Sequence, residues 1–272
     1  MKILVVGGGA MGQAFARGIS SSDNGHVCAV VENDIINAQK CTSFGVTVFE
    51  SITDVVKDPM WVDPDVCVVA VKPNDVAGVG EQLQGVIPTT CVAVSIAAGI
   101  SISTLQESFG NLPLVRAMPN IAASELMSAT AMCTSDWISE KHEQDSREVL
   151  EALGTVVRVD EELMDLVTAV SGSGPAYFFL LAEYIAAAAE KHGLDIEVAH
   201  QLITQTFLGA ATMAKEVGSF ATLRERVTSP GGTTAAAIDA FKAHDFEAAV
   251  FAGVQAALER GLELDEKNSG KD

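Results

Sequence analysis

Hydrophobic positions in the first 160 residues gather in short, nearly continuous apolar runs, and stretches with helical spacing separate these runs. Such runs are typical of strands that are covered on both faces of a parallel sheet. They predict strands at 2–7, 26–31, 46–49, 65–71, 91–99, 112–120, 131–135 and 155–160, with a helix at 139–153. The alternation of strands and helices predicts an α/β domain with a doubly wound, mainly parallel sheet.

The pattern changes near residue 161, where the β-branched runs end and long segments rich in Ala and Leu begin. These segments predict helices at 162–170, 174–192, 195–218, 221–227, 233–243 and 245–264. We therefore expect an α/β domain over 1–160, an all-helical domain over 161–264 and a frayed polar tail over 265–272. Segment 57–65 contains two prolines and is expected to form a surface loop.

Composition narrows the functions that this chain can have. Its 272 residues are 48% hydrophobic, and 36 acidic against 17 basic residues give a net charge of −19. A general nucleic-acid or anionic-membrane surface needs clustered cations, so both are excluded. Local fields must therefore hold any anionic ligand, because the overall field repels it. The acidity fits a saline habitat or solubility alone.

The cysteines, the histidines and the N-terminus bear on the cellular location of the protein and on whether it binds a metal ion. The five cysteines are widely spaced without a C-x-x-C pair, which predicts reduced core residues of a cytoplasmic protein. The five histidines form no H-x-x-x-H pair, so no metal site is expected. The chain begins directly with a strand, and no stretch of ~20 apolar residues lacks charges, so neither a signal peptide nor a membrane span is expected.

A glycine turn follows the first predicted strand. Gly7-Gly8-Gly9-Ala10-Met11-Gly12 fits G-x-G-x-x-G and opens an apparent helix, which is the context that a dinucleotide site requires. Gly7 permits the tight turn, Gly9 lets the backbone approach a pyrophosphate, and Gly12 allows close packing of helix and strand. The unpaired N–H groups at the helix start favour the negative charge of the pyrophosphate.

The end of the second strand bears on the choice of cofactor. Glu32 comes 20 residues after Gly12, where a carboxylate can accept hydrogen bonds from the adenosine ribose. Asn33 and Asp34 follow, and no cation appears before Lys40. A 2′-phosphate would meet two acids, so the sequence favours NADH, with NADPH as the alternative.

Further cofactor contacts are expected beyond the carboxyl ends of the strands, where ligands bind in doubly wound sheets. The motifs AVKP (70–73), SIAAG (95–99) and RAMPN (116–120) stand at such ends. The predicted cofactor-binding residues are Gly7, Gly9, Ala10, Met11, Gly12, Glu32, Ala70, Val71, Lys72, Pro73, Ala97 and Asn120. Two of them have simpler alternatives, because Lys72 could be merely solvated and the Asn120 amide could merely close a turn.

Two motifs in the helical half need explanation. SGSGPAY (171–177) contains Ser173, but the G-x-S-x-G spacing of a serine nucleophile is absent, so we interpret Ser173 as an N-cap. VTSPGGTT (227–234) interrupts helical sequence with a proline, two glycines and several hydroxyls. By itself it is either a helix corner or an anion-binding nest.

The order of these motifs, with QTFLGAATM at 205–213, resembles pyrroline-5-carboxylate reductase over nearly the whole chain. The pair SGSGPAY and TSPGGTT is the specific part of the resemblance. It implies a Rossmann domain, an all-α C-terminal dimerisation domain, a homodimer and often a decamer of five dimers. It also implies NAD(P)H-dependent reduction of 1-pyrroline-5-carboxylate to L-proline, with the substrate held by Ser229, Gly232, Thr233 and Thr234.

The motifs contain no acid–base histidine and no carboxylate dyad, which suits an imine that arrives protonated or takes its proton through a hydroxyl. We predict that the Thr234 hydroxyl bonds the ring nitrogen as the catalytic group. We predict that Ser229 and the loop amides hold the carboxylate. The sequence departs from the family at Ile121-Ala122, where Thr-Pro is usual, at Ser128 in place of glycine, and at Arg226, where Asn or another polar residue is common.

Three alternatives remain. A β-hydroxyacid dehydrogenase places a catalytic lysine on the first long helix of its second domain, whereas here Lys191 stands at the far end of that helix. A non-catalytic dinucleotide-binding regulator would have no need of Ser229 and Thr234. A reductase that acts on a larger cyclic imine is not distinguished by sequence.

Overall fold

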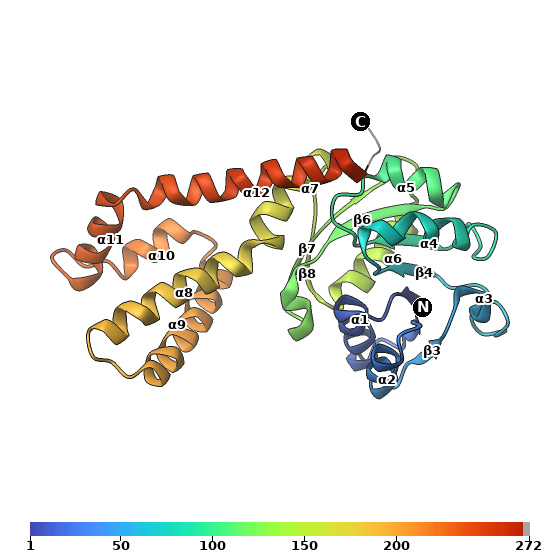
Figure 1. Cartoon of the computed structure of the whole chain (residues 1–272), viewed down its shortest axis with the longest axis horizontal. Helices are drawn as coiled ribbons and strands as arrows, with labels where there is room; N and C mark the ends of the chain where they lie inside the picture. The colour runs from blue at the N-terminus through green and yellow to red at the C-terminus, as the bar shows by residue number, and fades with distance from the viewer. Residues whose placement is uncertain (269–272) are drawn as a thin grey trace. The chain divides into compact units, whose positions relative to one another are not determined.

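The computed structural model describes residues 1–268 and contains two compact units. One unit comprises residues 1–175 together with the end of the chain from residue 257, and the other comprises residues 176–256. The first is an α/β unit and the second is entirely helical, as Figure 1 shows. Within residues 1–268, no helix is long and apolar enough to cross a membrane.

The α/β unit is built on an eight-stranded sheet with the order β3-β2-β1-β4-β5-β6-β7-β8. All neighbouring strands are parallel except β6 and β7, which confirms the predicted doubly wound, mainly parallel class. The strands are β1 Lys2–Val6, β2 Val27–Val31, β3 Thr47–Phe49, β4 Val66–Val69, β5 Val92–Ser95, β6 Leu114–Met118, β7 Ser128–Thr134 and β8 Gly154–Arg158.

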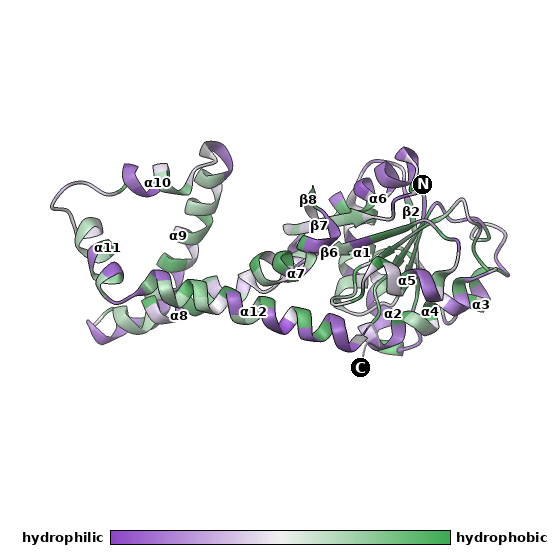
Figure 2. Cartoon of the chain, turned by 90° about the horizontal axis from the view of Figure 1, so that it is seen from above, coloured by the Kyte–Doolittle hydropathy of each residue, from purple (hydrophilic) through white to green (hydrophobic). Residues whose placement is uncertain are grey.

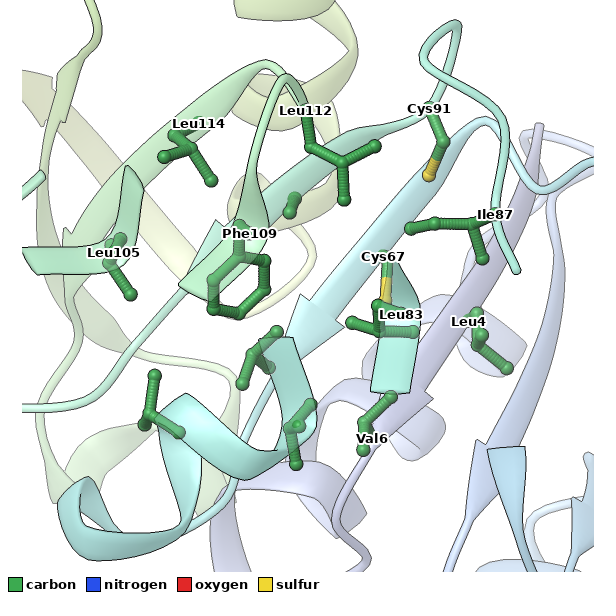
Figure 3. Close-up of a cluster of buried hydrophobic side chains, with 14 of the residues drawn as sticks. Leu4, Val6, Cys67, Leu83, Ile87, Cys91, Leu105, Phe109, Leu112 and Leu114 are labelled. Atoms are coloured by element: carbon green, nitrogen blue, oxygen red, sulfur yellow. The ribbon is translucent and has the colours of Figure 1, made fainter. Parts of the chain in front are cut away.

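Helices cover both faces of this sheet, because alternate residues of each strand point to opposite sides. In β1, Leu4 and Val6 join one buried cluster, whereas Ile3 and Val5 join the other. Figure 3 shows part of the first cluster, in which Phe109 and Leu83 lie near Cys67 of the sheet. The covering helices are α1 Ala10–Ser21, α2 Ile35–Ser43, α3 Ile52–Val55, α4 Val76–Leu83, α5 Ile102–Phe109 and α6 Glu140–Glu151.

Trp61 gives the predicted surface loop a fixed anchor. Its neighbours Met60 and Val62 are exposed, but Trp61 is only 2% exposed and belongs to the first core cluster. Its backbone N–H also donates to the carbonyl of Asp58 at 2.9 Å. The polar and proline-rich surroundings of Trp61 hid this role in the sequence.

Short helices connect the last strand to the helical unit. They are the 3₁₀ segment η3 Glu161–Leu163, the α-helix α7 Met164–Val167 and the π-helical segment η4 Thr168–Gly172. The chain then enters α8 without a break, because Ser173 has helical angles of φ −81° and ψ −20°. The interpretation of Ser173 as an N-cap is therefore wrong, since a cap residue adopts extended angles.

The helical part contains α8 Gly174–Lys191, α9 Ile196–Val217, α10 Phe220–Arg226, α11 Thr233–Ala243 and α12 Phe246–Asn268. Hydrophobic residues are frequent along α8 and α9 in Figure 2. Many large apolar side chains are exposed there, among them Phe178, Phe179 and Leu202. A surface of this kind marks an interaction site.

The two compact units differ in extent from the domain limits predicted from sequence. Residues 161–175 pack with the α/β unit, and so does the end of α12 from residue 257. The predicted polar tail begins inside α12, which continues to Asn268. The remaining tail positions, 269–272, lie outside the described residues.

Candidate functional site

The glycine turn between β1 and α1 leaves no room for side chains at Gly7, Gly8 and Gly12, and backbone atoms block the first and last of these. Gly7 has a φ of +101°, and a Cβ atom there would lie 2.7 Å from the carbonyl oxygen of Ala70. A Cβ atom on Gly12 would lie 1.9 Å from the carbonyl oxygen of Gly7. Gly9 is different, because nothing lies within 4 Å of its would-be Cβ. The turn is therefore packed tightly against the backbone of Ala70 and Gly7, and it is open at Gly9.

The start of α1 is available to an anion. Gly9 is the N-cap residue, no side chain caps the helix, and the first turn holds no acidic residue. The first N–H groups of a helix, here those of Ala10, Met11 and Gly12, have no intrahelical partners and carry a partial positive charge. The turn therefore fits the pyrophosphate of a dinucleotide, and contact with a cofactor stays a prediction.

Glu32 is tied to this turn from the end of β2. Its Oε2 accepts the Gly8 N–H at 2.8 Å, and its Oε1 accepts the Asp34 N–H at 2.8 Å. The Asp34 side chain in turn caps α2 by accepting the Asn37 N–H at 2.9 Å. Two carboxylates, separated by Asn33 in sequence, are thus fixed by backbone donors.

The other predicted cofactor residues lie after the carboxyl ends of β4 and β5. The Ala70 N–H donates to Val6 O at 2.8 Å, which places the start of the AVKP motif at the end of β1 and beside Gly7. Val71 is half-buried, Lys72 is exposed, and Pro73 begins the 3₁₀ segment η1 Pro73–Asp75. Ala97 is buried two residues beyond β5. The structure thus brings these residues to one edge of the sheet.

Asn120 follows β6 and is engaged within the protein. Its Oδ1 accepts the Ala122 N–H at 3.1 Å, which closes the turn into η2 Ile121–Glu125, and its Nδ2 donates to Ser171 O at 3.0 Å. Each amide atom can still make one further hydrogen bond. A cofactor contact of Asn120 remains a prediction, but turn closure and a link to the π-helical segment are what the structure shows.

Ser128, one of the departures from the family pattern, has a clear local role. Its side chain is buried, and its Oγ accepts the Asn120 N–H at 3.0 Å and lies 3.0 Å from Thr130 Oγ1. A glycine here would leave that N–H without this partner. No sequence signal pointed to this bond, because it depends on the antiparallel return of β7 beside β6.

Arg116 in β6 is buried and does not face solvent. Its guanidinium contacts Glu161 at 3.4 Å and Asp165 at 3.5 Å, both in the segment that leaves the sheet. Burial raises the pKa of the Asp165 carboxyl, although Arg116 acts in the opposite direction. Sequence reasoning missed this cluster because its members are 45 and 49 residues apart.

The loop at 227–234 lies in the helical unit, between α10 and α11. Gly231 has a φ of +72°, and the Gly232 N–H donates to Ser229 O at 3.0 Å. Gly232 is the N-cap of α11, which has neither a side-chain cap nor an acid in its first turn. Within residues 1–268, the hydroxyls of Ser229 and Thr234 make no hydrogen bond. The loop thus presents unpaired backbone donors and two unpaired hydroxyls, with Thr233 and Thr234 in the first turn of α11.

Basic residues stand just before this loop. Arg224 and Arg226 occupy the last turn of α10, and the Thr228 hydroxyl donates back to Arg224 O at 2.6 Å. Glu225 stands between the two arginines in sequence, so the last turn of α10 carries two basic residues and one acidic residue shortly before the uncapped start of α11.

Comparison with known proteins gives the family of this chain. A family model described as pyrroline-5-carboxylate reductase dimerisation matches residues 161–264, and one described as an oxidoreductase family with an NAD-binding Rossmann fold matches residues 1–85. Pyrroline-5-carboxylate reductase of Arabidopsis thaliana is 35% identical over 267 residues, which cover 97% of this chain and 95% of that protein. The chain belongs to the pyrroline-5-carboxylate reductase family.

Further relatives of this family agree. The pyrroline-5-carboxylate reductase of Pseudomonas aeruginosa is 42% identical over 228 residues, covering 82% of this chain and 81% of its own. The structure of a pyrroline-5-carboxylate reductase from Coxiella burnetii is 31% identical, with a TM-score of 0.89 over 96% of this chain and 97% of that one. A Plasmodium falciparum pyrroline carboxylate reductase with NADP bound is 24% identical, with a TM-score of 0.79 over 97% of this chain and 98% of that one, and supports the fold.

The His, Cys, Asp and Glu side chains of the described residues bear on whether the chain can hold a metal ion. Residues 1–268 hold no group of three or more His, Cys, Asp or Glu side chains that could bind a metal ion. Each of the five cysteines is free and buried.

Proposed function

We propose that this protein reduces 1-pyrroline-5-carboxylate to L-proline with a nicotinamide dinucleotide as hydride donor. The observation that carries the proposal is the 35% identity to a pyrroline-5-carboxylate reductase over 97% of the chain. Two local features support it: the open, uncapped start of α1 and the uncapped start of α11. When bound, the dinucleotide supplies the hydride that reduces the C=N bond.

The loop before α11 binds the substrate carboxylate in this proposal. Helical N–H groups without a cap attract anions, and Gly232 lets the backbone come close. Ser229 adds a hydroxyl donor, and Thr233 begins the helix at the same place. The overall charge of −19 makes such a local anion site necessary for an anionic substrate.

Thr234 holds the ring nitrogen of the substrate in this proposal. Its hydroxyl lies in the first turn of α11 and has no hydrogen-bond partner among residues 1–268. A hydroxyl can donate to the nitrogen as the C=N bond becomes an amine, and it can accept from a nitrogen that is already protonated. The reaction therefore needs no carboxylate or histidine at this position.

Replacing Thr234 tests this assignment. We expect Thr234→Ala to lower kcat by about 100-fold, the effect typical of losing a positioned proton-transfer group. The dissociation constant of NADH, measured by fluorescence, should change little because the dinucleotide site lies on α1. Thr234→Ser keeps a hydroxyl and should retain most of the turnover. Wild-type kcat in Thr234→Ala would refute the role of the hydroxyl.

Measurement of turnover also distinguishes the five-membered substrate from the larger cyclic imine that the sequence left open. Initial rates with pyrroline-5-carboxylate and with its six-membered homologue should favour the five-membered ring. A dehydrogenase that acts on β-hydroxyacids gains no support, because Lys191, the lysine that such a mechanism would need, is the last residue of α8.

We also propose the finer properties of cofactor, assembly and location. NADH is the preferred donor, since Glu32 and Asp34 stand where a 2′-phosphate would have to lie. The family's dimerisation region supports a homodimer. We propose that five such dimers assemble into a decamer. Five buried free thiols fit a reducing, cytoplasmic location.

A further inference from the structure

The start of α8 leaves one backbone carbonyl without its usual helical donor. In a continuous helix the N–H of residue 175 would donate to the Ser171 carbonyl, but residue 175 is a proline, which has no N–H and whose ring crowds that carbonyl. The turn before it is widened, because the Ser173 N–H donates to Thr168 O at 2.8 Å, five residues earlier. The Ser171 carbonyl is therefore open to a donor from another part of the chain.

Asn120 supplies that donor from the end of β6. Its Nδ2 donates to Ser171 O at 3.0 Å, although 51 residues separate the two. The other polar atoms of this side chain and its N–H are engaged as well, since Oδ1 accepts the Ala122 N–H and the Asn120 N–H donates to the buried Ser128 Oγ at 3.0 Å. Because Oδ1 can only accept and Nδ2 can only donate, these bonds allow one orientation of the amide.

A missing side chain brings the same segment against β6. A Cβ atom on Gly172 would lie 2.8 Å from Met118 Cε, and Met118 is the last residue of β6. Gly172 therefore permits a close approach that a larger residue would hinder. Residues 168–174 are thus held at the carboxyl end of β6 by the Asn120 side chain and by this packing contact.

The carboxyl end of β6 belongs to the edge of the sheet where the proposed cofactor binds. In the strand order, β4, β5 and β6 follow β1 on the side away from β2. A dinucleotide with its pyrophosphate at α1 and its adenosine at β2 extends its nicotinamide half over the ends of these strands. In the proposed function, residues 168–174 therefore border the nicotinamide ring.

We propose that Asn120 is a positioning residue, which replaces the helical donor missing at Pro175 and so holds residues 168–174 as a wall beside the nicotinamide ring. This inference rests on the proposed function. Asn120 acts through the Ser171 carbonyl, and Ser128 fixes Asn120 in the required orientation. A displacement of about 1 Å can lower the rate by about 100-fold, because hydride transfer needs close alignment of the two reactants.

A double-mutant cycle tests whether one donor replaces the other. Asn120→Ser keeps a hydroxyl that can cap the Ala122 N–H but is too short to reach Ser171. Pro175→Ala supplies the missing helical N–H. We expect Asn120→Ser to lower kcat about tenfold when Pro175 is present and about twofold or less in the Pro175→Ala background, with the KM for the imine changed less than about twofold in either.

Hydrogen exchange measures the same link without any substrate. In the full-length protein, the backbone amides of residues 168–174 should exchange about tenfold faster in Asn120→Ser, and about twofold faster or less when the change is made in the Pro175→Ala background. Ser128→Ala removes the acceptor of the Asn120 N–H and should accelerate the same amides by a smaller factor. Asn111→Ser is the matched control that should change neither exchange nor kcat, because Asn111 is exposed in the turn after α5.

Several results would contradict this role. An equal loss of kcat in both backgrounds would mean that Asn120 acts directly on the cofactor or the substrate. Faster exchange with unchanged kcat would leave the bond a purely structural one, and unchanged exchange would remove the link to Ser171. If Pro175→Ala itself abolishes turnover, the exchange cycle decides between the two donors. Absence of imine reduction by the wild type would instead refute the proposed function, and the exchange cycle would still test the link.

Discussion

Individual glycines in the turn after β1 have opposite functions, which substitutions can separate. A methyl group on Gly12 would collide with the backbone of Gly7, whereas one on Gly9 would enter open space. We expect Gly12→Ala to lower the free energy of unfolding by about 1–3 kcal/mol because backbone atoms have to move apart.

Gly9→Ala should leave the unfolding midpoint of the free protein nearly unchanged, because a methyl group there meets no protein atom. It should weaken NADH binding if the pyrophosphate occupies that space, as we propose. Thermal unfolding with and without NADH measures both effects. Gly78→Ala in α4 is the control, since nothing surrounds that position either and it lies outside the turn. Equal loss of NADH binding in Gly78→Ala would contradict this assignment.

Glu32 permits a test of cofactor preference. We expect the wild-type protein to bind NADH more tightly than NADPH. Glu32→Gln keeps an acceptor for the Gly8 N–H but removes a charge, so it should shift the ratio of the two dissociation constants toward NADPH by about fivefold to tenfold.

Asp23→Asn is the control. Asp23 is an exposed residue that follows α1, and its replacement changes the net charge by the same amount as Glu32→Gln, so the ratio of the two dissociation constants should stay unchanged. A wild-type preference for NADPH would contradict the argument from Glu32 and Asp34, and titration of both cofactors decides it.

The roles of residues near the turn were predictable from the sequence where the interacting groups are close neighbours along the chain. The glycine spacing and the acid at the end of β2 depend on neighbours in sequence. Turn closure by Asn120 was predictable for the same reason. The bonds of Arg116 to Asp165 and of Asn120 to Ser171 were not, because those partners come from distant segments, and the bond of Ser128 to the Asn120 N–H depends on the return of β7 beside β6. The binding roles of Ser229 and Thr234 remain predictions, which rest on the family resemblance and on the free hydroxyls.

Among the elements, those of the α/β unit bury the side chains of all five cysteines. Burial raises the pKa of the Cys28, Cys67 and Cys133 thiols from 9.0 to about 12. These thiols stay protonated in the folded protein, whereas in the unfolded chain they ionise near their ordinary pKa. The stability that they contribute is present below pH 9 and is lost as the pH rises from about 9 through about 12.

We therefore expect a thiol reagent at pH 8 to react slowly with the native protein. In denaturant the same reagent should react with all five thiols. The free energy of unfolding should fall between pH 9 and 12, and Cys67→Ala should reduce that slope. Rapid labelling of native protein would contradict the burial, and an unchanged slope would remove the link between thiol ionisation and stability.

Most elements were predictable from periodicity alone. Each predicted strand is present, and the observed ends differ by a few residues where the strands enter turns. The segment 162–170 is the exception, since a single predicted helix is observed as successive 3₁₀, α and π turns. Its ties to Arg116 and Asn120 are tertiary contacts, which a periodic pattern does not contain.

For the whole molecule, the exposed apolar side chains of the helical unit argue for a partner chain. Phe179 in α8 is 66% exposed, and the matching family model is a dimerisation region. Phe179→Asp should raise the dimer dissociation constant by about 30-fold or more if this ring is buried between copies. Analytical ultracentrifugation measures the shift and also reports any assembly beyond the dimer.

Met60→Asp is a matched control, because Met60 is a similarly exposed apolar residue on the α/β unit. Its sedimentation should match that of the wild type. A stable dimer in Phe179→Asp would move the interface to another face of the helical unit.

The chain crosses between its two units twice, and both crossings fall inside continuous helices. The first lies at residue 175 in α8 and the second at residue 256 in α12. The helical unit is therefore an insertion tethered at both ends, without a linker loop at either junction. A protease needs an extended segment, so mild digestion will not release the two units as separate fragments. Shortening the chain before residue 257 would also remove part of the α/β unit, which makes the C-terminus a poor place to truncate.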